Sequence, residues 1–583
     1  MKTITIEHLA RVEGNGGVTV TLDGKVVTDV KFNIFEGPRL IERLSVGRTP
    51  EEDVSMSPRI CAICSISHKN AVIRAMENAL SVDVPEKVVL ARELMHMGEM
   101  IESHSLHVYY LALPDYLGFP NAIAMASQFA FEVKIALEMK EFGNHIMQVL
   151  SGRYIHGENP VIGGFGMFPT REDLVWIKNR AVQFMPFVLK TASLFCELGY
   201  PDSPEEDTLY ACCEPGKNSY GFWGDEICLS SGEKIFRDDY EKLTNEFVVS
   251  HSFAKRSRYK GKPYSVGALA RVNNLGERLK GEAGKYYKKY FGDRWKRNPL
   301  FHNAAQALEI LYCFERIPSL VDEMLKIAED PPIIKYTVEA GKGTGLVEAP
   351  RGLLIHHHEI VDGLVKRVDI ITPTAQNAED IERYCRIAAQ KLLDEGQEEK
   401  IKERMEVVVR AFDPCISCSA HLVRVEKALP DSWEEKLENI KSQGTPYYIG
   451  VGNPDLSDDA LGIHITKKLR EKGVENVWLE TELTGEDLLF VDSADHPIVF
   501  LDAVDMQDDP GKITLVPFEY MFGQISLSHK LSPFVKAFRS REQVKRTYIL
   551  GVQPEFVGEG REVTQTVQAS ANKIIGRLLE KTC

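Results

Sequence analysis

The sequence predicts an α+β protein whose mostly helical body follows an N-terminal antiparallel sheet and precedes a separate α/β domain. Residues 3–35 alternate apolar and polar side chains around a Gly-rich turn and an Asp-Gly pair, which is typical of short antiparallel strands. Apolar residues then recur at helical intervals over about 58–150, 170–198 and 304–327. From residue 447 onward strands and helices alternate, which indicates a mostly parallel sheet covered by helices.

The chain of 583 residues exceeds the length at which a single core stops growing, so we expect more than one domain. Residues 205–300 are richer in Gly, Tyr and Lys with weak periodicity, and we interpret them as hairpins and loops without assigned chemistry. A charged stretch with a Pro-Asp turn follows His421. We therefore predict a body over 1–421, a charged linker over 422–446 and an α/β domain over 447–583.

Charge and composition exclude several classes of partner. Lys and Arg total 70 against 85 for Asp and Glu, and this net charge of -15 disfavours nucleic acid and anionic membrane surfaces. The first 20 residues include Glu7, Arg11 and Glu13 and contain no run that would make a signal peptide or a membrane span. We therefore expect a cytoplasmic protein with no transmembrane segment and no nucleic-acid partner, whose 11 cysteines are reduced.

Two CxxC pairs carry the clearest chemical signal. RICAICSISH places Cys61 and Cys64 ahead of His68, and DPCISCSAH places Cys415 and Cys418 ahead of His421. Thiolates three positions apart can face one metal, and two such pairs supply soft sulfur ligands. Taken alone, the pairs would favour a structural zinc site. A zinc knuckle usually closes a short loop, whereas these pairs bracket the whole helical body and favour a buried catalytic centre.

The two segments, RxCxxCxxxH and DPCxxCxxH, resemble the paired signatures of nickel-iron hydrogenase large subunits. Further matching segments are RVEG (11–14), LIERLSVGR (40–48), LALPD (111–115), ALARVN (268–273), EAPRG (348–352) and ITPT (371–374). RICAICSISHKNA and ALARVN look most like the cytoplasmic, multi-subunit type. The resemblance implies a nickel held by four thiolates, with Cys61 and Cys415 terminal. Cys64 and Cys418 would bridge to an iron that carries carbon monoxide and cyanide.

The resemblance also implies groups that handle protons. Arg351 would overhang the metals with Asp115 and Asp413 as charge partners, and either its guanidinium or a terminal cysteine sulfur would act as the base. An ordinary buried ion pair is the alternative for Arg351. Glu13 matches the glutamate through which the family passes protons to solvent. Without the resemblance, a carboxylate that pairs with Arg11 or caps a turn would be the preferred interpretation.

Other family positions imply a second ion and a pocket for the diatomic ligands. Glu42, His421 and a backbone carbonyl near Ile370 match ligands of a magnesium-type ion, for which carboxylate and carbonyl oxygens are suitable. Pro373 and Thr374 match the segment that packs around the diatomic ligands, although alone they indicate only a turn.

Several histidines and one asparagine need separate interpretation. We expect His68 to hydrogen-bond a cysteine rather than bind metal. The run at 356–358 is interpreted as structural or solvated. Asn15 stands where many relatives have His, a departure that bears on the proton exit.

The tail carries a second resemblance. Residues 450–464, GVGNPDLSDDALGIH, resemble the opening motif of hydrogenase maturation endopeptidases, and Asp459, Asp502 and His529 match that family's metal-contacting residues. On its own the motif would be a Gly-rich turn that holds phosphate, but its acidic pair would repel an anion. The resemblance implies a protease that cleaves after His421 in the presence of nickel. No conventional nucleophile set can be assigned in this domain.

Electrons must leave the body through partners. The remaining cysteines are scattered and do not suit an iron-sulfur cluster; they are Cys196, Cys212, Cys213, Cys228, Cys313, Cys385 and Cys583. By resemblance, the partners are an iron-sulfur small subunit, further electron-transfer subunits, and maturation proteins that deliver nickel and iron. Two alternatives remain: an uncleaved fusion whose tail is a metal chaperone or binding module, and a silent electron-transfer subunit related to respiratory complex I, against which the CxxC cysteines argue.

Overall fold

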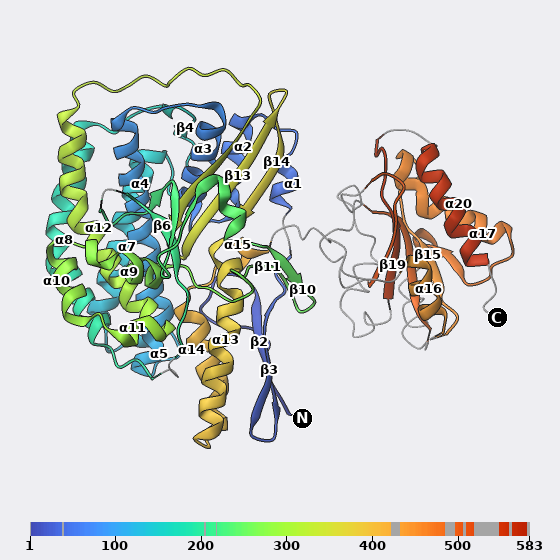
Figure 1. Ribbon diagram of the computed structural model, residues 1–583, viewed down its shortest axis with the longest axis horizontal. Coiled ribbons are helices and arrows are strands. Elements are labelled where there is room, and N and C mark those ends of the chain that lie inside the picture. The colour runs from blue at the N-terminus through green and yellow to red at the C-terminus, as the bar shows by residue number, and fades with distance from the viewer. Residues whose placement is uncertain are drawn as a thin grey trace. The chain divides into compact units, whose positions relative to one another are not determined.

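A computed structural model describes most of the chain in two compact units, 1–423 and 424–583. The described residues are 2–37, 40–202, 206–216, 218–420, 432–442, 444–483, 496–504, 509–517, 547–558 and 562–579. The predictions for His421 and His529 lie outside them. Each unit has a hydrophobic core of its own, and Figure 1 shows the helices and strands of both.

The first unit begins with the antiparallel sheet that the sequence predicts. β1 (Lys2–Ile6) pairs with β2 (Gly16–Asp23), which pairs with β3 (Val26–Ile34). Side chains on one face, including Val18, Val20 and Phe32, are buried, as the alternating pattern requires. Helix α13 (Pro373–Asp394) packs against β3 and anchors the sheet to the body.

Long helices form the body, as predicted. They are α3 (Ser65–Leu80), α4 (Glu86–Leu106), α7 (Ala130–Ser151), α8 (Arg171–Glu197) and α12 (His302–Lys326). α4 packs on α7 and α12, and α12 packs on α8, so these helices lie side by side (Figure 1). The shorter helices are α1 (Ile41–Ser45), α2 (Pro50–Met56), α5 (Leu113–Leu117), α6 (Ala122–Met125), α9 (Ala268–Leu275), α10 (Gly281–Tyr290), α11 (Asp293–Arg297), α14 (Ile401–Ala411) and α15 (Ile416–Ser419).

A second sheet, which the sequence pattern did not predict, stands beside α3. Its order is β14 (Leu364–Ile371), β13 (Gly352–Val361), β12 (Gly341–Ala349) and β7 (Trp223–Gly224). Alternate positions on β12 are glycines, and a Cβ at Gly343 or Gly345 would lie 2.2 or 2.1 Å from a carbonyl oxygen of α3. The helix that follows Cys64 therefore rests directly on the strand that leads to Arg351.

The hairpins expected in 205–300 lie between residues 211 and 256, but the prediction of loops is wrong for much of 268–297, where α9, α10 and α11 form. Helices this short contain too few apolar repeats to give a clear periodic pattern. β6 (Ala211–Glu214), β8 (Glu226–Leu229) and β9 (Lys234–Phe236) pair antiparallel in that order, and β10 (Phe247–Val249) pairs with β11 (Ser252–Arg256). A small pairing of β4 (Pro160–Val161) with β5 (Gly164–Phe165) lies earlier in the chain. None of the helices in the described ranges is long and apolar enough to cross a membrane.

The second unit is built on a mostly parallel sheet, in agreement with the strand and helix alternation. The order is β16 (Val477–Leu479), β15 (Tyr447–Gly450), β17 (Ile498–Ala503), β19 (Thr547–Val552) and β18 (Ile513–Pro517), with β18 antiparallel to β19 and the other pairs parallel. Helices α17 (Leu461–Glu471) and α20 (Gln565–Leu579) pack on each other and on this sheet.

The prediction that 422–446 is only a charged linker is wrong for its second half. Residues 433–442 form helix α16 (Trp433–Ser442), whose Leu437 and Ile440 are buried in the core of the second unit. The high charge of this segment concealed an apolar pair spaced three residues apart, which is enough to give a short helix one buried face.

Candidate metal centre

The cysteines of the two CxxC pairs converge from opposite ends of the first unit. Cys61 follows the short turn Ser57–Ile60, and Cys64 stands at the start of α3. Cys415 directly precedes α15, which contains Cys418. The Sγ atoms of Cys61 and Cys415 are 3.5 Å apart, those of Cys64 and Cys418 3.8 Å, and those of Cys415 and Cys418 2.6 Å. All four sulfurs lie within 4.8 Å of one another and are buried.

The electrostatics of this cluster suit a bound cation. Burial raises the pKa of the Cys415 and Cys418 thiols well above the usual range. For Cys61, burial also raises the pKa, but hydrogen bonds from the neighbouring thiols lower it further than burial raises it. Several thiolates can coexist in such a space only when a positive charge compensates them. The donor set, four soft sulfurs, fits nickel or another thiophilic transition metal.

Arg351 lies beside the cluster, in the turn between β12 and β13. Its Nε donates to the Asp413 carbonyl oxygen at 2.8 Å and its Nη2 to Asp413 Oδ1 at 3.0 Å. Burial lowers the pKa of Arg351, but the charges of Asp413, Cys415 and Cys64 raise it well above its ordinary value. Nη1 is buried and has no hydrogen-bond partner among the residues that the structure describes. A donor thus remains available at the metal centre, which also fits a bound group there.

The expected pairing of Asp115 with Arg351 is wrong. Asp115 forms ion pairs with Arg11 and with Arg410, whose Nε and Nη2 lie 2.8 and 2.9 Å from its carboxylate. Within the described residues no ion pair joins Asp115 to Arg351. α5, which carries Asp115, faces the end of α14, and Arg410 is the arginine there. The link to the centre is indirect, because the Arg410 carbonyl accepts from the Asp413 N–H at 2.8 Å.

Glu13 is held against the second CxxC pair. Its backbone bridges to Cys415, its carbonyl accepts from the Ile416 N–H at 3.1 Å, and its carboxylate accepts from the Ser417 N–H at 3.1 Å and from the Ser417 hydroxyl. The residue is only partly buried. The alternative pairing with Arg11 is not what holds Glu13, since Arg11 contacts Asp115. A carboxylate therefore stands between a metal-site loop and the surface.

A family model described as nickel-dependent hydrogenase matches residues 39–141 and 219–421. The chain belongs to the nickel-dependent hydrogenase family. The alpha chain of sulfhydrogenase 1 from Pyrococcus furiosus is 41% identical over 422 residues, which cover 72% of this chain and 98% of that relative. The vhu-type F420-non-reducing hydrogenase chain of Methanocaldococcus jannaschii is 33% identical, over 67% of this chain and 99% of that relative.

Solved structures of the family agree with this fold. An NAD+-reducing [NiFe]-hydrogenase in the H2-reduced state superposes with a TM-score of 0.65 and 28% identity, covering 72% of this chain and all of that one (100%). A [NiFeSe] hydrogenase variant from Desulfovibrio vulgaris Hildenborough, at 23% identity, shares the fold with a TM-score of 0.61 over 72% of this chain and 99% of that one.

The structure of this family member also places the residues predicted to surround the metals. Pro373 and Thr374 open α13, and Thr374 Oγ1 accepts from the Cys415 N–H at 2.8 Å. His68 Nδ1 lies 2.9 Å from His356 Nε2.

The histidine run at 356–358 is buried and is not solvated. His356 Nδ1 lies 3.4 Å from His358 Nε2, and His358 Nδ1 lies 3.0 Å from Asp53 Oδ2. Together with His68, these groups form a chain of imidazoles that ends on a carboxylate. Two-residue spacing on β13 places His356 and His358 on the same face, toward α3.

Glu42 stands in an acidic cluster. Its Oε1 accepts from the Ile370 N–H at 2.8 Å and from Lys255 Nζ at 3.0 Å. Lys255 also lies 2.9 Å from Glu246 and 3.9 Å from Asp369. Burial raises the pKa of Glu42, and it raises that of Glu246 to about 8. Within the described residues, the carboxylates of this cluster outnumber its ammonium group, so its charge suits a further cation. The predicted partner His421 lies outside the described residues.

Sequence reasoning missed Glu99, a buried carboxyl of α4 that lies at the start of α3. It accepts from the Ile66 N–H at 2.6 Å, the Ser67 N–H at 2.9 Å and the Ser67 hydroxyl, and burial raises its pKa to about 8. These bonds satisfy N–H groups that a helix start leaves unpaired, immediately after Cys64. The signal in the sequence was a single carboxylate within the mostly apolar segment 94–101 of α4.

In the second unit, the acids of the motif have different environments. The Asp458 carboxylate accepts from the N–H groups of Glu555, Phe556 and Thr564 at 2.8, 2.9 and 2.7 Å, so it holds loops together. Asp459 and Asp502 are buried near the carboxyl ends of the adjacent parallel strands β15 and β17. His529 is outside the described residues, within which only the CxxC cysteines form a group of three or more potential metal ligands.

Proposed function

We propose that residues 1–421 form the large subunit of a hydrogenase that oxidises dihydrogen reversibly to protons and electrons. The convergence of four buried thiols beside Arg351, whose Nη1 has no partner within the described residues, carries this proposal. Soft sulfur ligands suit a metal that changes oxidation state, and a neighbouring cation can stabilise charge that develops there.

The metals would be nickel and an iron carrying carbon monoxide and cyanide. Cys61 and Cys415 would hold nickel alone, and Cys64 and Cys418 would hold both metals. When bound, this pair of metals supplies the heterolytic cleavage of dihydrogen. Pro373 and Thr374 would pack around the diatomic ligands; the contact of Thr374 with the Cys415 N–H supports this.

Protons would leave through the chain's own groups. Arg351, held by Asp413, would keep a positive charge over the thiolates. Glu13 would accept protons near Cys418 and pass them to solvent, because its carboxylate contacts the Ser417 hydroxyl and it is only partly buried. Asp115 would act only indirectly, through Arg410.

Electrons would pass to an iron-sulfur small subunit, then to further electron-transfer subunits. Each of the two relatives is named as one subunit of its hydrogenase, which supports an assembly of several chains. Maturation proteins would deliver nickel and iron. By its likeness to the multi-subunit type, we place the protein in the cytoplasm. A magnesium-type ion near Glu42 and Ile370, completed by His421, would neutralise the acidic cluster around Lys255.

For the tail we propose a maturation endopeptidase that cleaves after His421. The family match ends at residue 421, the units divide at 423, and an alignment of 422 residues already spans 98% of a relative. Asp459 and Asp502, with His529, would bind the metal. Asp459→Ala should leave the chain uncut while Asp455→Ala, an exposed control in the same loop, is processed normally. Full processing of the Asp459 variant would contradict the endopeptidase role of the tail and favour the alternative, in which the tail is a metal chaperone or binding module.

The hydrogenase proposal is tested by the isotope exchange between dihydrogen gas and water that the complex catalyses when it is purified without oxygen. Cys418→Ser should abolish exchange because the metals lose a bridging ligand. Cys313→Ser, which changes an equally buried thiol on α12, should keep it. Exchange at the normal rate in the Cys418 variant would contradict the assignment of the metal centre.

A further inference from the structure

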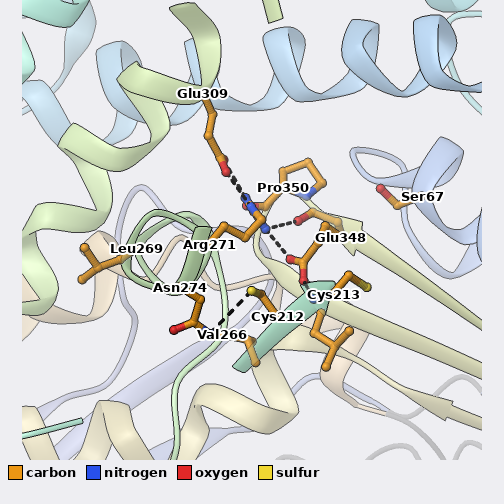
Figure 2. A network of polar contacts seen from close by, with 12 residues as sticks. Ser67, Cys212, Cys213, Val266, Leu269, Arg271, Asn274, Glu309, Glu348 and Pro350 are labelled. Atoms are coloured by element: carbon orange, nitrogen blue, oxygen red, sulfur yellow. Dashed lines mark hydrogen bonds and ion pairs between the residues drawn. The ribbon is translucent and has the colours of Figure 1, made fainter. Parts of the chain in front are cut away.

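Arg271, on α9, is fully buried and uses all five N–H groups of its guanidinium (Figure 2). Nε and Nη2 donate to the two carboxylate oxygens of Glu309 at 2.6 Å each. Nη1 donates to Glu348 Oε2 at 2.6 Å and to the Ala349 carbonyl at 3.1 Å. Nη2 donates also to the Pro350 carbonyl at 3.2 Å. The side chain therefore clamps α12 to the end of β12.

The two carboxylates of this clamp are themselves fully engaged. Glu309 Oε2 lies 2.9 Å from His104 Nε2, and Glu309 Oε1 accepts from the Tyr220 hydroxyl at 2.5 Å. Glu348 Oε1 accepts from the Cys213 N–H at 2.7 Å. Burial raises the pKa of Glu309, but the charge of Arg271 and its hydrogen bonds lower it to about 2. A buried network with every oxygen paired is rigid.

The clamp grips the backbone that presents Arg351. Ala349 and Pro350 directly precede Arg351, and Gly352 follows it at φ +136°. A Cβ at Gly352 would lie 2.5 Å from a side-chain carbon of Val266, immediately before α9. The turn is thus fitted against the start of the same helix that carries Arg271. Displacement of this helix would displace the turn.

We propose that Arg271 is a positioning residue for Arg351. By fixing the backbone from Glu348 to Pro350, Arg271 holds Arg351 in place beside the four thiols. The inference rests on the proposed function, because it assigns Arg351 a role at the metal centre. Arg351 is bound to Asp413 through Nε and Nη2, so its remaining donor points correctly only while the turn keeps its place. Misplacement by about 1 Å can reduce a rate on the order of 100-fold.

A merely structural role for Arg271 is the competing explanation, and the chain offers a matched control. Arg256 is also fully buried, lies 3.1 Å from Glu379 and 2.6 Å from Glu382, and donates to the Phe32 carbonyl at 3.1 Å. Its contacts join β11, α13 and β3. Replacing either arginine with lysine removes the same planar fork, but only Arg271 holds the turn before Arg351.

The experiment compares Arg271→Lys and Arg256→Lys in the complete complex, with nickel content, melting temperature and the kcat and KM of dihydrogen-driven exchange as readouts. We expect similar losses of melting temperature and retained nickel in both. Only Arg271→Lys should lower kcat, by roughly 10- to 100-fold, with KM unchanged, because the centre is misaligned while dihydrogen access is not.

A double-mutant cycle with Arg351→Lys decides how Arg271 acts. If it acts through Arg351, the double variant should be about as slow as Arg351→Lys alone, whereas the effect of Arg256→Lys should add independently. Full additivity of Arg271→Lys, or a kcat equal to that of Arg256→Lys, would overturn the inference. Absence of exchange in the wild-type complex would instead refute the proposed function.

If Arg271→Lys fails to fold or to retain nickel, Glu309→Gln addresses the same question with Glu382→Gln as its control. Each substitution preserves shape and removes one negative partner of a buried arginine. Loss of kcat with retained nickel in Glu309→Gln alone supports the positioning role. Loss of nickel in this variant as well would make the cluster a folding element and contradict the proposal.

Discussion

The CxxC cysteines of the first unit and the acidic residues of the 450–464 motif in the second unit differ in how far their side chains are bound by the surrounding backbone. In the first unit, the four thiols lie within 4.8 Å of one another, and Arg351 Nη1 has no partner within the described residues. In the second unit, Asp458 gives its carboxylate to three backbone N–H groups. Both segments stand out in the sequence, but only the surroundings tell a reactive group from a structural one.

The difference also lies in the support that each region receives. Buried polar groups are unfavourable unless they are paired, so a cluster of polar groups left for a ligand needs a scaffold that holds it in place. Glu99 holds the helix start after Cys64, Thr374 holds Cys415, and Arg271 holds the turn before Arg351. Each of these supports comes from an element distant in the chain. The metal centre is therefore fixed by the tertiary fold rather than by its own loops.

The sharpest test of the comparison removes one terminal thiol. Cys61→Ser should eliminate both nickel binding and hydrogen-deuterium exchange, because a serine hydroxyl is a hard ligand that stays protonated. Cys385→Ser, another buried cysteine with no metal role here, should preserve both. Nickel content by mass spectrometry separates loss of metal from loss of activity. A Cys61 variant with full nickel content would contradict the four-thiolate site.

A smaller loss is expected at the proton exit. Glu13→Gln should retain nickel and reduce proton-coupled turnover by about 100-fold or more, because the amide cannot accept and release a proton. Glu7→Gln is the control, since Glu7 is an exposed carboxylate in the same N-terminal segment. Turnover is measured with an artificial electron acceptor. Equal rates in the two variants would remove Glu13 from the proton path.

In the second unit we expect an effect on stability rather than on hydrogen chemistry. Asp458→Ala should lower the free energy of unfolding of this unit by roughly 2–5 kcal/mol, because three backbone N–H groups lose a buried, charged acceptor. Leu437→Ala on α16 should have a comparable effect, roughly 2–5 kcal/mol, through a cavity. Hydrogen exchange of the unit's amides measures both. Unchanged protection in Leu437→Ala would contradict the placement of α16 in the core.

The smallest predicted effect is a change in pH dependence. The pKa of Glu309 is about 2 in the fold against an ordinary value of 4.5. Because the folded value is lower, the ionised group contributes stability above about pH 4.5 and loses that contribution as pH falls toward 2. Glu309→Gln should therefore show a shallower loss of stability in this window than wild type, measured by urea unfolding. Parallel curves would contradict the buried ion pair.

The sequence predicted residues within short motifs correctly, but it did not predict contacts between residues that are far apart in the chain. Spacing and residue type sufficed to select the four cysteines, because each pair lies in a short motif. The Arg351–Asp413 pair was instead implied by the resemblance of EAPRG and DPCxxCxxH to segments of the family, and the structure contains it. Spacing could not say which arginine meets Asp115, since Arg410 is 295 positions away in the chain. Likewise, the weak periodicity of residues 205–300 did not predict the helix that carries Arg271, nor that the partners of Arg271 come from α12 and β12. Charge alone also hid the buried face of α16.

Whether the four thiols hold nickel is decided by the metal content of the complex purified without oxygen, together with X-ray absorption at the nickel edge. We predict nickel and iron in equal amounts, with sulfur as the dominant ligand of nickel, and loss of that signal in Cys418→Ser. Zinc in place of nickel, bound by the same cysteines, would make the two CxxC pairs a structural site and contradict the proposed hydrogenase centre.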